Sequence, residues 1–281
     1  MFRKGQTLQI LNSIVLIFLV AANCFSVAIA ADSNHQFVLI SEIEWEPLNP
    51  ARGDKSPQAG TLWGDRNGVE PTGFLVKFAD GFSSPPHIHN VAYRGVVIKG
   101  HIHNDDPNAE NMWMPSGSFW TQPAGEIHIT SAKGNNNLAY IEIDKGPYLV
   151  LPAKEAFDSG ERPINVDESN VVWINQSENS ASSGKLKMSY LWGKPNNEQL
   201  YGALIQLPPK LTTTISSSGS IFHAVVIKGQ PHYYVNKTDV KYLEAGSYFN
   251  SKGSSVHKIS NKKKEDIILY VRTNGMLEFA H

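Results

Sequence analysis

Cysteine is almost absent from this chain, and there is no excess of charge of either sign. Among 281 residues there is one cysteine, Cys24, and the formal net charge is −1. Cys24 lies in an N-terminal segment that we expect to be removed, so the remaining chain cannot form a disulfide. A nearly neutral chain offers no electrostatic case for binding nucleic acid or an anionic membrane surface. The sequence therefore predicts a fold that is held by core packing alone and that has no nucleic-acid partner.

The first thirty residues have the pattern of a secretory signal peptide. The basic pair Arg3 and Lys4 precedes an apolar run over residues 14–22, and small residues end the segment at Ala30. This run is shorter than the ~20 apolar residues that a transmembrane helix needs, so an uncleaved membrane anchor is the less favoured alternative. We expect residues 1–30 to be removed, which leaves a periplasmic or secreted protein with no membrane attachment.

The sequence has few stretches with the hydrophobic period of a long helix. It contains an internal repeat, in which similar segments recur 129 residues apart. Leu62 to Gly64 recurs as Leu191 to Gly193, and Val96 to Gly100 recurs as Val225 to Gly229. This period is far beyond the roughly 20–50 residues of solenoid units, so it indicates a duplicated domain. Within each repeat, short β-branched and aromatic runs are separated by clusters of Gly, Pro, Asn and Asp. Such a pattern is typical of an all-β sandwich or barrel.

Three histidines of the first repeat are candidate metal ligands. His87 and His89 are two residues apart, so on an extended strand both imidazoles point to the same side. His128 follows in a second motif that is rich in glycine and proline. Neutral imidazole binds borderline divalent metals, and three protein ligands with an open position are typical of a reactive site. The sequence predicts that these three residues hold one divalent ion.

The two motifs resemble the signature motifs of the cupin family. Gly-x5-His-x-His runs from Gly81 to His89, Gly100 follows, and Gly-x5-Pro-x-Gly-x2-His runs from Gly117 to His128. The resemblance covers both repeats, so the chain is similar to exported bacterial bicupins of unknown function that are related to the ChrR-like cupins. It implies an all-β fold of two tandem cupin (jelly-roll) barrels, with a metal in the mouth of at least one of them.

The second repeat lacks the histidine pair and is expected to be metal-free. Ungapped alignment places Ser216 and Ser218 at the positions of the first two histidines, and hydroxyl groups do not replace imidazole for a borderline metal. His257 keeps the third position alone. We therefore expect one ion per chain and divide the rest of the sequence into an N-terminal cupin domain with the metal site (31–150), a linker (151–184) and a degenerate C-terminal cupin domain (185–281).

Two further residues are candidate catalytic groups, Tyr93 and Glu126. In the cupin pattern a glutamate follows the second histidine by four residues, and this chain has Tyr93 there. A phenol titrates near pH 10, so Tyr93 is a weaker ligand candidate than a carboxylate and more naturally a hydrogen-bond donor beside the ligands. Glu126 lies two residues before His128. It is either a fourth ligand or a group that exchanges protons at the metal, or else an exposed turn residue, and both interpretations stay open.

A second His-x-His follows Gly100 but is not expected to bind the metal. Ile102 lies between His101 and His103 and is the apolar residue of this strand. If Ile102 faces the barrel interior, strand alternation turns both histidines away from it. We interpret them as structural or surface residues.

The resemblance implies an exported metal-binding bicupin. Three-histidine cupins without the glutamate include iron-dependent dioxygenases, which favours a dioxygenase-like metalloenzyme acting on a small molecule. The alternative is a non-catalytic cupin that binds or senses a small ligand or a metal, and the sequence does not decide between the two. The ion is left open among Fe, Zn, Mn, Ni and Cu, because the resemblance suggests iron whereas the intrinsic order of affinities outside the cell favours zinc or copper. A homo-oligomer is compatible with the sequence.

Overall fold

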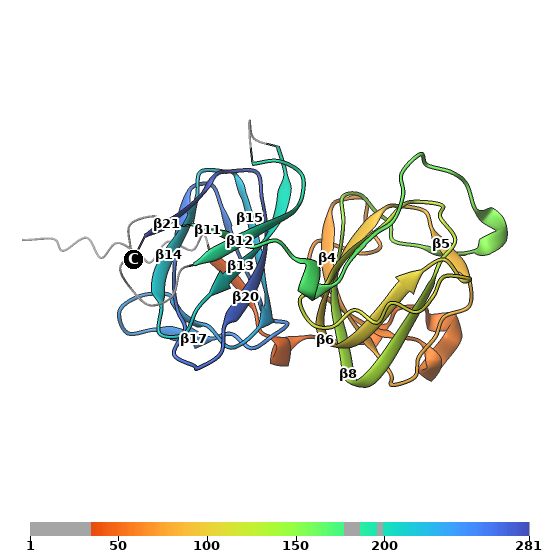
Figure 1. Ribbon diagram of the computed structural model, residues 1–281, viewed down its shortest axis with the longest axis horizontal. Coiled ribbons are helices and arrows are strands. Elements are labelled where there is room, and N and C mark those ends of the chain that lie inside the picture. The colour runs from red at the N-terminus through yellow and green to blue at the C-terminus, as the bar shows by residue number, and fades with distance from the viewer. Residues whose placement is uncertain (1–34, 177–185, 196–198, 281) are drawn as a thin grey trace, which may run out of the picture. The chain divides into compact units, whose positions relative to one another are not determined.

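The computed structural model describes residues 35–176, 186–195 and 199–280 (Figure 1). The predicted signal peptide (1–30) and residues 177–184 of the predicted linker lie outside the described residues. Two jelly-roll domains of strands confirm the predicted all-β bicupin fold. Among the described residues, no helix is long and apolar enough to span a bilayer.

The first domain is built on an antiparallel sheet with two short strands beside it. Its strands are β2 (Glu46–Pro47), β3 (Gln58–Trp63), β4 (Thr72–Phe78), β5 (His87–His89), β6 (Tyr93–Asp105), β7 (Phe119–Gln122), β8 (Ile129–Ile143), β9 (Val150–Pro152) and β10 (Ile164–Val166). The sheet has the order β10-β7-β6-β8-β4-β3-β2, and β5 pairs separately with β9. Four short 3-10 helices lie between the strands of this part of the chain: η1 (Ile40–Glu42), η2 (Pro50–Lys55), η3 (Ala153–Glu155) and η4 (Glu168–Asn170).

The second domain repeats this plan with one sheet of seven strands and one of five. Its strands are β11 (Ile174–Asn175), β12 (Lys187–Trp192), β13 (Tyr201–Leu207), β14 (Thr212–Ser217), β15 (Ile221–Lys228), β16 (His232–Tyr234), β17 (Val240–Tyr242), β18 (Tyr248–Lys252), β19 (Ser255–Ser260), β20 (Ile267–Thr273) and β21 (Leu277–Ala280). One sheet has the order β1-β18-β15-β20-β13-β12-β11, where β1 is His35–Val38, and the other has the order β17-β16-β19-β14-β21.

Strand pairing crosses the predicted domain boundaries at four points in the described chain. β1 falls within the predicted first domain, yet it pairs antiparallel with β18 of the second. Three strands of the predicted linker are divided between the domains: β9, which begins at the boundary, pairs with β5, β10 pairs with β7, and β11 pairs with β12. The segment between the repeats therefore contributes strands to both domains.

Three clusters of buried apolar residues hold the fold together. One fills the first domain around Phe74, Val97 and Trp120, and one fills the second around Phe222 and Phe249. A third cluster joins the two domains through the opposite faces of their sheets. Strand alternation explains this arrangement, since successive side chains of a buried strand enter two different clusters.

A buried carboxylate lies where the two repeats meet. Trp63 donates a hydrogen bond to the Tyr140 hydroxyl (3.1 Å), and the repeat contains the same pair, Trp192 and Tyr270, at 2.9 Å. Both tyrosine hydroxyls then donate to Glu142, at 3.1 and 2.8 Å. The Glu142 carboxylate also accepts from Arg272 Nη1 at 3.2 Å, and Arg272 itself is 2 % exposed. Glu142 and Arg272 are both buried, and each supplies the opposite charge and the hydrogen bonds that the other needs there.

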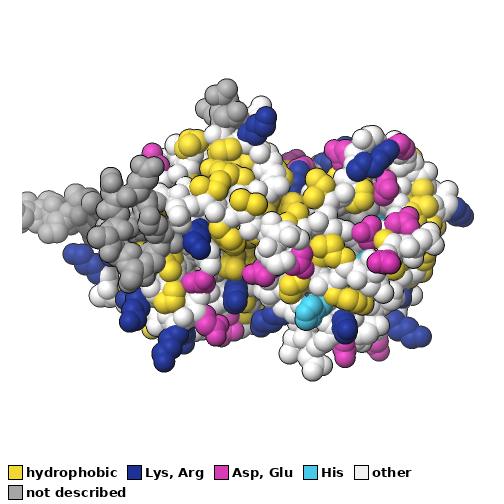
Figure 2. All heavy atoms as spheres, viewed as in Figure 1, with side chains coloured by type: hydrophobic (Ala, Val, Ile, Leu, Met, Phe, Trp, Pro, Cys, Tyr) yellow, Lys and Arg dark blue, Asp and Glu magenta, His cyan; other side chains and the backbone are white. Residues whose placement is uncertain are grey.

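Charged side chains of both signs are interspersed on the face shown in Figure 2. A mixed surface of this kind agrees with the formal net charge of −1.

Candidate metal centre

Strand pairing brings the two histidine motifs together. The amide of His87 donates to the carbonyl of His128 (3.1 Å), and the amide of His128 donates to the carbonyl of His87 (3.0 Å). Two residues that exchange both hydrogen bonds lie directly opposite each other in an antiparallel ladder. His89 follows on β5, which is held on its other side by β9. Motifs that are far apart in the sequence thus become immediate neighbours.

A glycine turn makes this pairing possible. Gly125 has a φ of +77°, a left-handed conformation that residues with a side chain rarely adopt. An added Cβ would also lie 2.4 Å from the Phe157 carbonyl oxygen. Gly125 therefore allows the chain to turn tightly between β7 and His128.

The three imidazoles form one buried group. Their candidate ligand atoms all lie within 4.8 Å of one another, and this is the one such group among the described residues. The ring centroids are 4.3 Å apart for His87 and His128, 5.0 Å for His87 and His89, and 5.2 Å for His89 and His128. The chemistry of this donor set suits a borderline divalent ion.

Each imidazole is oriented through its Nδ1 atom by a backbone carbonyl. The three acceptors are Pro85 O at 2.9 Å for His87, Leu149 O at 2.9 Å for His89 and Glu126 O at 3.1 Å for His128. A carbonyl accepts only, so each Nδ1 must carry the proton and each Nε2 must present a lone pair. Metal-binding histidines are held in this way in known sites. The rings therefore have the tautomer that coordination requires.

Burial keeps all three rings neutral. Desolvation lowers the pKa of His87 below its usual value of 6.5, and lowers that of His89 further, with repulsion from His128 adding to the effect. The pKa of His128 falls to about 3, again mainly through desolvation. Neutral imidazole is the form that binds metal, so proton competition begins at a lower pH than it would for exposed histidine.

Tyr93 lies beside this group as a neutral hydrogen-bond donor. Its hydroxyl donates to Asn104 Oδ1 at 2.9 Å and lies 3.4 Å from His128 Nε2. Asn104 is in turn fixed by Gln122 and Thr130. Burial raises the pKa of Tyr93 well above its usual range, so the phenol keeps its proton at neutral pH. Tyr93 thus lies next to the candidate ligand His128, and its role as a hydrogen-bond donor at a metal stays a prediction.

The Glu126 carboxylate is not brought into the group. The side chain lines a separate open hollow with Asp158 and Arg162. The contact of Glu126 with His128 is made by its backbone oxygen, which accepts from Nδ1. Glu126 is therefore placed to orient the His128 ring through its backbone oxygen, and its carboxylate is not placed to exchange protons at the metal.

The second His-x-His faces as expected, but only one of its histidines is exposed. Ile102 belongs to the core of the first domain, and His101 is exposed. His103 points away from that core and is nevertheless fully buried, because the Trp113 ring covers it at a centroid distance of 6.0 Å. Both rings face away from the core, as expected, and of the two expected roles His101 has the surface one and His103 the structural one.

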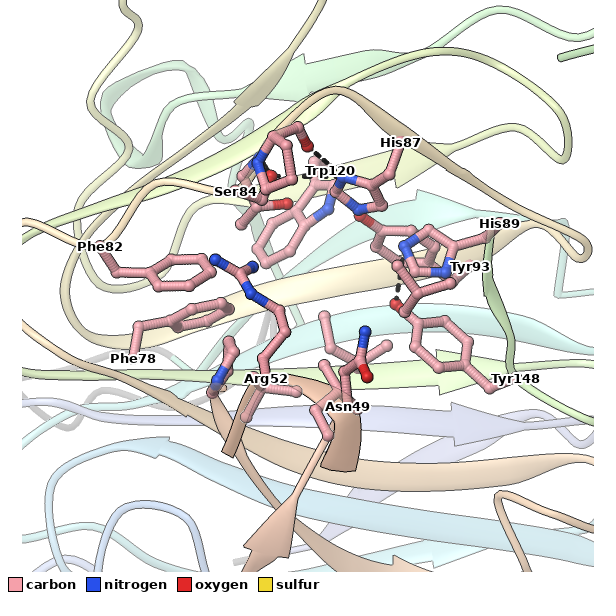
Figure 3. Close-up of a pocket in the computed structure, with 17 residues that line it drawn as sticks. Asn49, Arg52, Phe78, Phe82, Ser84, His87, His89, Tyr93, Trp120 and Tyr148 are labelled. Carbon is pink, nitrogen blue, oxygen red and sulfur yellow. Dashed lines mark hydrogen bonds between the residues drawn. The ribbon is translucent and has the colours of Figure 1, made fainter. Parts of the chain in front are cut away.

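A cavity of about 110 Å³ adjoins the histidines (Figure 3). Its wall is mostly aliphatic and aromatic, and no carboxylate lines it: Val76, Phe78, Phe82, Trp120, Ile141 and Tyr148 are among the lining residues. This volume has room for several waters or one small organic molecule. Sequence reasoning missed Tyr148, whose hydroxyl lies 3.2 Å from His89 Nε2. The pair is 59 residues apart, and no motif signals it.

The second domain has no equivalent group among its described residues. His257 pairs with Ile215 of β14, so Ile215 and Ser217 occupy the places of His87 and His89. These are one residue earlier than the ungapped alignment indicates. Both ring nitrogens of His257 are engaged, with the Tyr233 hydroxyl at 2.8 Å and the Ser251 hydroxyl at 3.1 Å.

A protein family covers nearly this whole chain. The family described as Domain of unknown function (DUF4437) matches residues 36–280. The chain belongs to this family. A search of curated proteins finds no match for it.

Solved structures show that this DUF4437 chain shares the cupin fold. A candidate dioxygenase from Nostoc punctiforme aligns at a TM-score of 0.62 with 13 % identity, covering 87 % of this chain and 82 % of that one. The oxalate decarboxylase of Lactobacillus farciminis, solved as a formate complex, aligns at 0.57 with 12 % identity and covers 87 % of each chain. The Bacillus subtilis oxalate decarboxylase, described with Mn(II) centers, aligns at 0.50 with 11 % identity over 87 % and 78 %. These likenesses concern the fold alone.

Proposed function

We propose that this protein is an exported bicupin that holds one divalent metal ion in its first domain and acts there on a small molecule. The observation that carries the proposal is the orientation of the three imidazoles. All three Nδ1 atoms are committed to backbone carbonyls, so the Nε2 atoms are the candidate ligand atoms, and an ion would compete only with the Tyr148 and Tyr93 hydroxyls for them. The pattern of residues 1–30 supports export to the periplasm or the medium.

The cavity supports a reaction whose chemistry is supplied mainly by the metal. No aspartate or glutamate lines it, and the pKa values of Tyr93 and Tyr148 are raised by burial. No protein group there is poised to exchange protons near neutral pH. A redox-active ion such as iron, held by three imidazoles with open positions, would supply the activation of dioxygen. We therefore favour a dioxygenase-like activity over hydrolysis or isomerisation.

The residues of the chain would prepare the site for this chemistry. His87, His89 and His128 hold the ion, and their backbone acceptors fix the ring orientations. Tyr93 keeps its proton and donates a hydrogen bond to Asn104 Oδ1, so the phenol next to the ion stays uncharged. The aromatic wall binds the apolar part of a substrate and excludes water from it.

The second candidate function is binding without turnover. It is favoured by the same lack of an acid or base in the cavity, because a site that only captures a ligand needs neither. The two candidates share the metal and the cavity and differ in whether the ligand is consumed.

Metal loading and oxygen consumption test the proposal. Protein purified from its native compartment should contain one ion per chain by elemental analysis, and His87→Ala protein should contain none. Protein loaded anaerobically with ferrous iron should then consume dioxygen with a member of a β-diketone, thiol or phenolic panel. Metal retention without any turnover would support the binding function, and failure of the wild-type protein to retain any metal would refute both.

A further inference from the structure

Arg52 extends into the cavity beside His87. It lines the cavity, and its guanidinium lies 5.6 Å from the centroid of the Phe82 ring. Figure 3 shows the guanidinium between the two phenylalanine rings, Phe78 and Phe82, and the His87 imidazole. Arg52 is close enough to contribute to the lowered pKa of His87 through repulsion, after the larger effect of burial. A permanent positive charge therefore faces the space next to the metal ligands.

The turn that carries Arg52 is well fixed by local hydrogen bonds. Arg52 lies in η2, whose N-cap Asn49 accepts from the amide of Ala51 at 3.1 Å. The amide of Asn49 donates to the Ser56 hydroxyl at 2.8 Å, and the Ser56 amide donates to Gly53 O at 3.0 Å. The base of the side chain is thus held by the turn.

Arg52 differs from the other arginines because it has no acidic partner. The described residues include five arginines, and four of them form ion pairs with carboxylates: Arg66 with Glu46, Arg94 with Asp144, Arg162 with Asp158, and Arg272 with Glu142 and Asp144. No ion pair or side-chain hydrogen bond is formed by Arg52 within the described part of the chain. A half-buried guanidinium has five donors, so it is suited to a ligand that brings its own acceptors.

The rest of the cavity defines the kind of ligand. Its wall is predominantly apolar and contains no carboxylate that would repel an anion. A single guanidinium matches one carboxylate through two parallel hydrogen bonds. A small dianion without an apolar part would leave one charge uncompensated and would not use the aromatic wall.

We propose that Arg52 anchors the carboxylate of a small hydrophobic monocarboxylic acid, whose apolar body packs against Phe78, Phe82 and Trp120. The inference rests on the proposed function in that it takes this cavity as the place where the ligand binds. It assigns Arg52 as the residue that selects acids over neutral molecules of the same shape.

Calorimetric titration of matched acids and amides tests this assignment. The ligands are benzoate, phenylacetate and hexanoate, their neutral amides, and oxalate, each titrated into metal-free and zinc-loaded protein. At least one monocarboxylate should bind the metal-free protein more tightly than its amide and more tightly than oxalate. Arg52→Gln should weaken binding of that acid by about 10- to 100-fold and leave the amide unchanged.

Two further variants control for charge and for general effects. Arg52→Lys keeps the charge but loses the planar fork, so it should bind the acid with intermediate affinity. Arg162→Gln removes a guanidinium from the hollow beside Glu126 and should leave acid binding unchanged. Melting temperatures of all variants establish that the fold is retained.

The results separate the anchor from the metal site. Equal affinity for acid and amide, no binding of any of the three acids, or an Arg52→Gln protein that binds the acid normally would overturn the assignment, whether or not zinc binds. If zinc fails to bind but acid binding still depends on Arg52, the metal function fails and the anchor stands. The metal-free arm is needed because a bound ion could take a carboxylate by itself.

Discussion

Each of the two jelly-roll domains places a histidine at the same point of an equivalent strand pair, and the two residues have different surroundings. His128 is paired with His87, and its Nε2 faces the other imidazoles. His257 is paired with Ile215 and has both nitrogens engaged by hydroxyl groups. The position in the motif is the same, so the partners of the two ring nitrogens decide whether the residue is available to a metal.

Aromatic packing fills the second domain where the first has its histidine cluster. The His257 ring stacks on Phe222 at 4.2 Å and 21°, and Phe249 and Tyr233 lie at 5.3 and 5.9 Å. Such contacts stabilise a core. We interpret the second domain as having the same fold as the first, with aromatic packing around His257 in place of the histidine cluster.

Substitution of the two equivalent histidines should separate binding from stability. His128→Ala removes one of three ligands and should weaken metal binding by at least about 100-fold. His257→Ala should leave metal binding unchanged but destabilise the protein by about 2–4 kcal/mol, because it opens a cavity and leaves two hydroxyls without their partner. Elemental analysis and denaturant titration measure the two effects, and two ions per wild-type chain would contradict the comparison.

The carboxylate between the domains should be costly to remove. Glu142→Ala takes away the acceptor of Tyr140, Tyr270 and Arg272, and leaves Arg272 buried with Asp144. We expect a loss of about 3 kcal/mol in the free energy of unfolding, at the low end for a broken buried pair because one carboxylate remains.

Denaturant titration measures this loss, and an exposed ion pair provides the control. Asp158→Ala breaks the pair with Arg162 on the surface and should change stability little. Equal stability of the Glu142→Ala and wild-type proteins would show that the network does not hold the domains together.

Acid should destabilise both domains through their buried histidines. The pKa is lowered to about 3 for His128 and for His257 and to about 4 for His223, in each case mainly by desolvation. Between pH 6.5 and 5 the unfolded chain takes up protons that the folded chain does not, so stability falls as the pH falls. Each such histidine contributes about 2 kcal/mol by pH 5.

The metal distinguishes the two domains in this pH range. If the first domain binds zinc through its neutral histidines, as we propose, zinc should restore part of the stability lost at pH 5. A His257→Phe protein should show a shallower pH dependence with or without zinc. Thermal unfolding at several pH values gives both results, and a free energy of unfolding that is constant from pH 6.5 to 5 would refute the expectation.

The smallest expected effect concerns Tyr148. Its hydroxyl lies 3.2 Å from His89 Nε2 and occupies the lone pair that a metal would use. Tyr148→Phe removes this competition, so the metal affinity should rise by a few-fold, up to about 10-fold. Calorimetric titration with zinc measures the change. A weaker affinity in the variant would mean that the hydroxyl supports the bound state instead.

Much of the fold and the histidine group could be predicted from the sequence because both depend on short periodic patterns. Alternation along a strand places His87 and His89 on one side, and the second motif supplies His128. The repeat in turn reveals two similar domains. Even so, the correspondence between the repeats shifts by one residue at Ile215, because pairing with His257 sets the register there.

The remainder of the site depends on contacts that no local pattern encodes. Arg52 reaches the cavity from a 3-10 turn, and Tyr148 reaches it from the segment after β8. The location of the Glu126 side chain and the burial of His103 also depend on residues outside their own motifs. A glycine turn directs Glu126 to another hollow, and a loop residue, Trp113, covers His103. The direction in which a strand side chain points follows from alternation, whereas its solvent exposure depends on whether another segment packs over it.

The pairing of β1 with β18 has a consequence for how the protein is made. Gln36 and Asn250 are hydrogen-bonded across 214 residues, so a strand synthesised early waits for a partner synthesised late. Contacts of such long range slow folding. They also mean that cutting the chain between the repeats would leave β1 on the wrong fragment and an open sheet edge on the other. The first strand of the described chain therefore ties the two domains together, and we expect neither repeat to form its complete set of sheets when expressed alone.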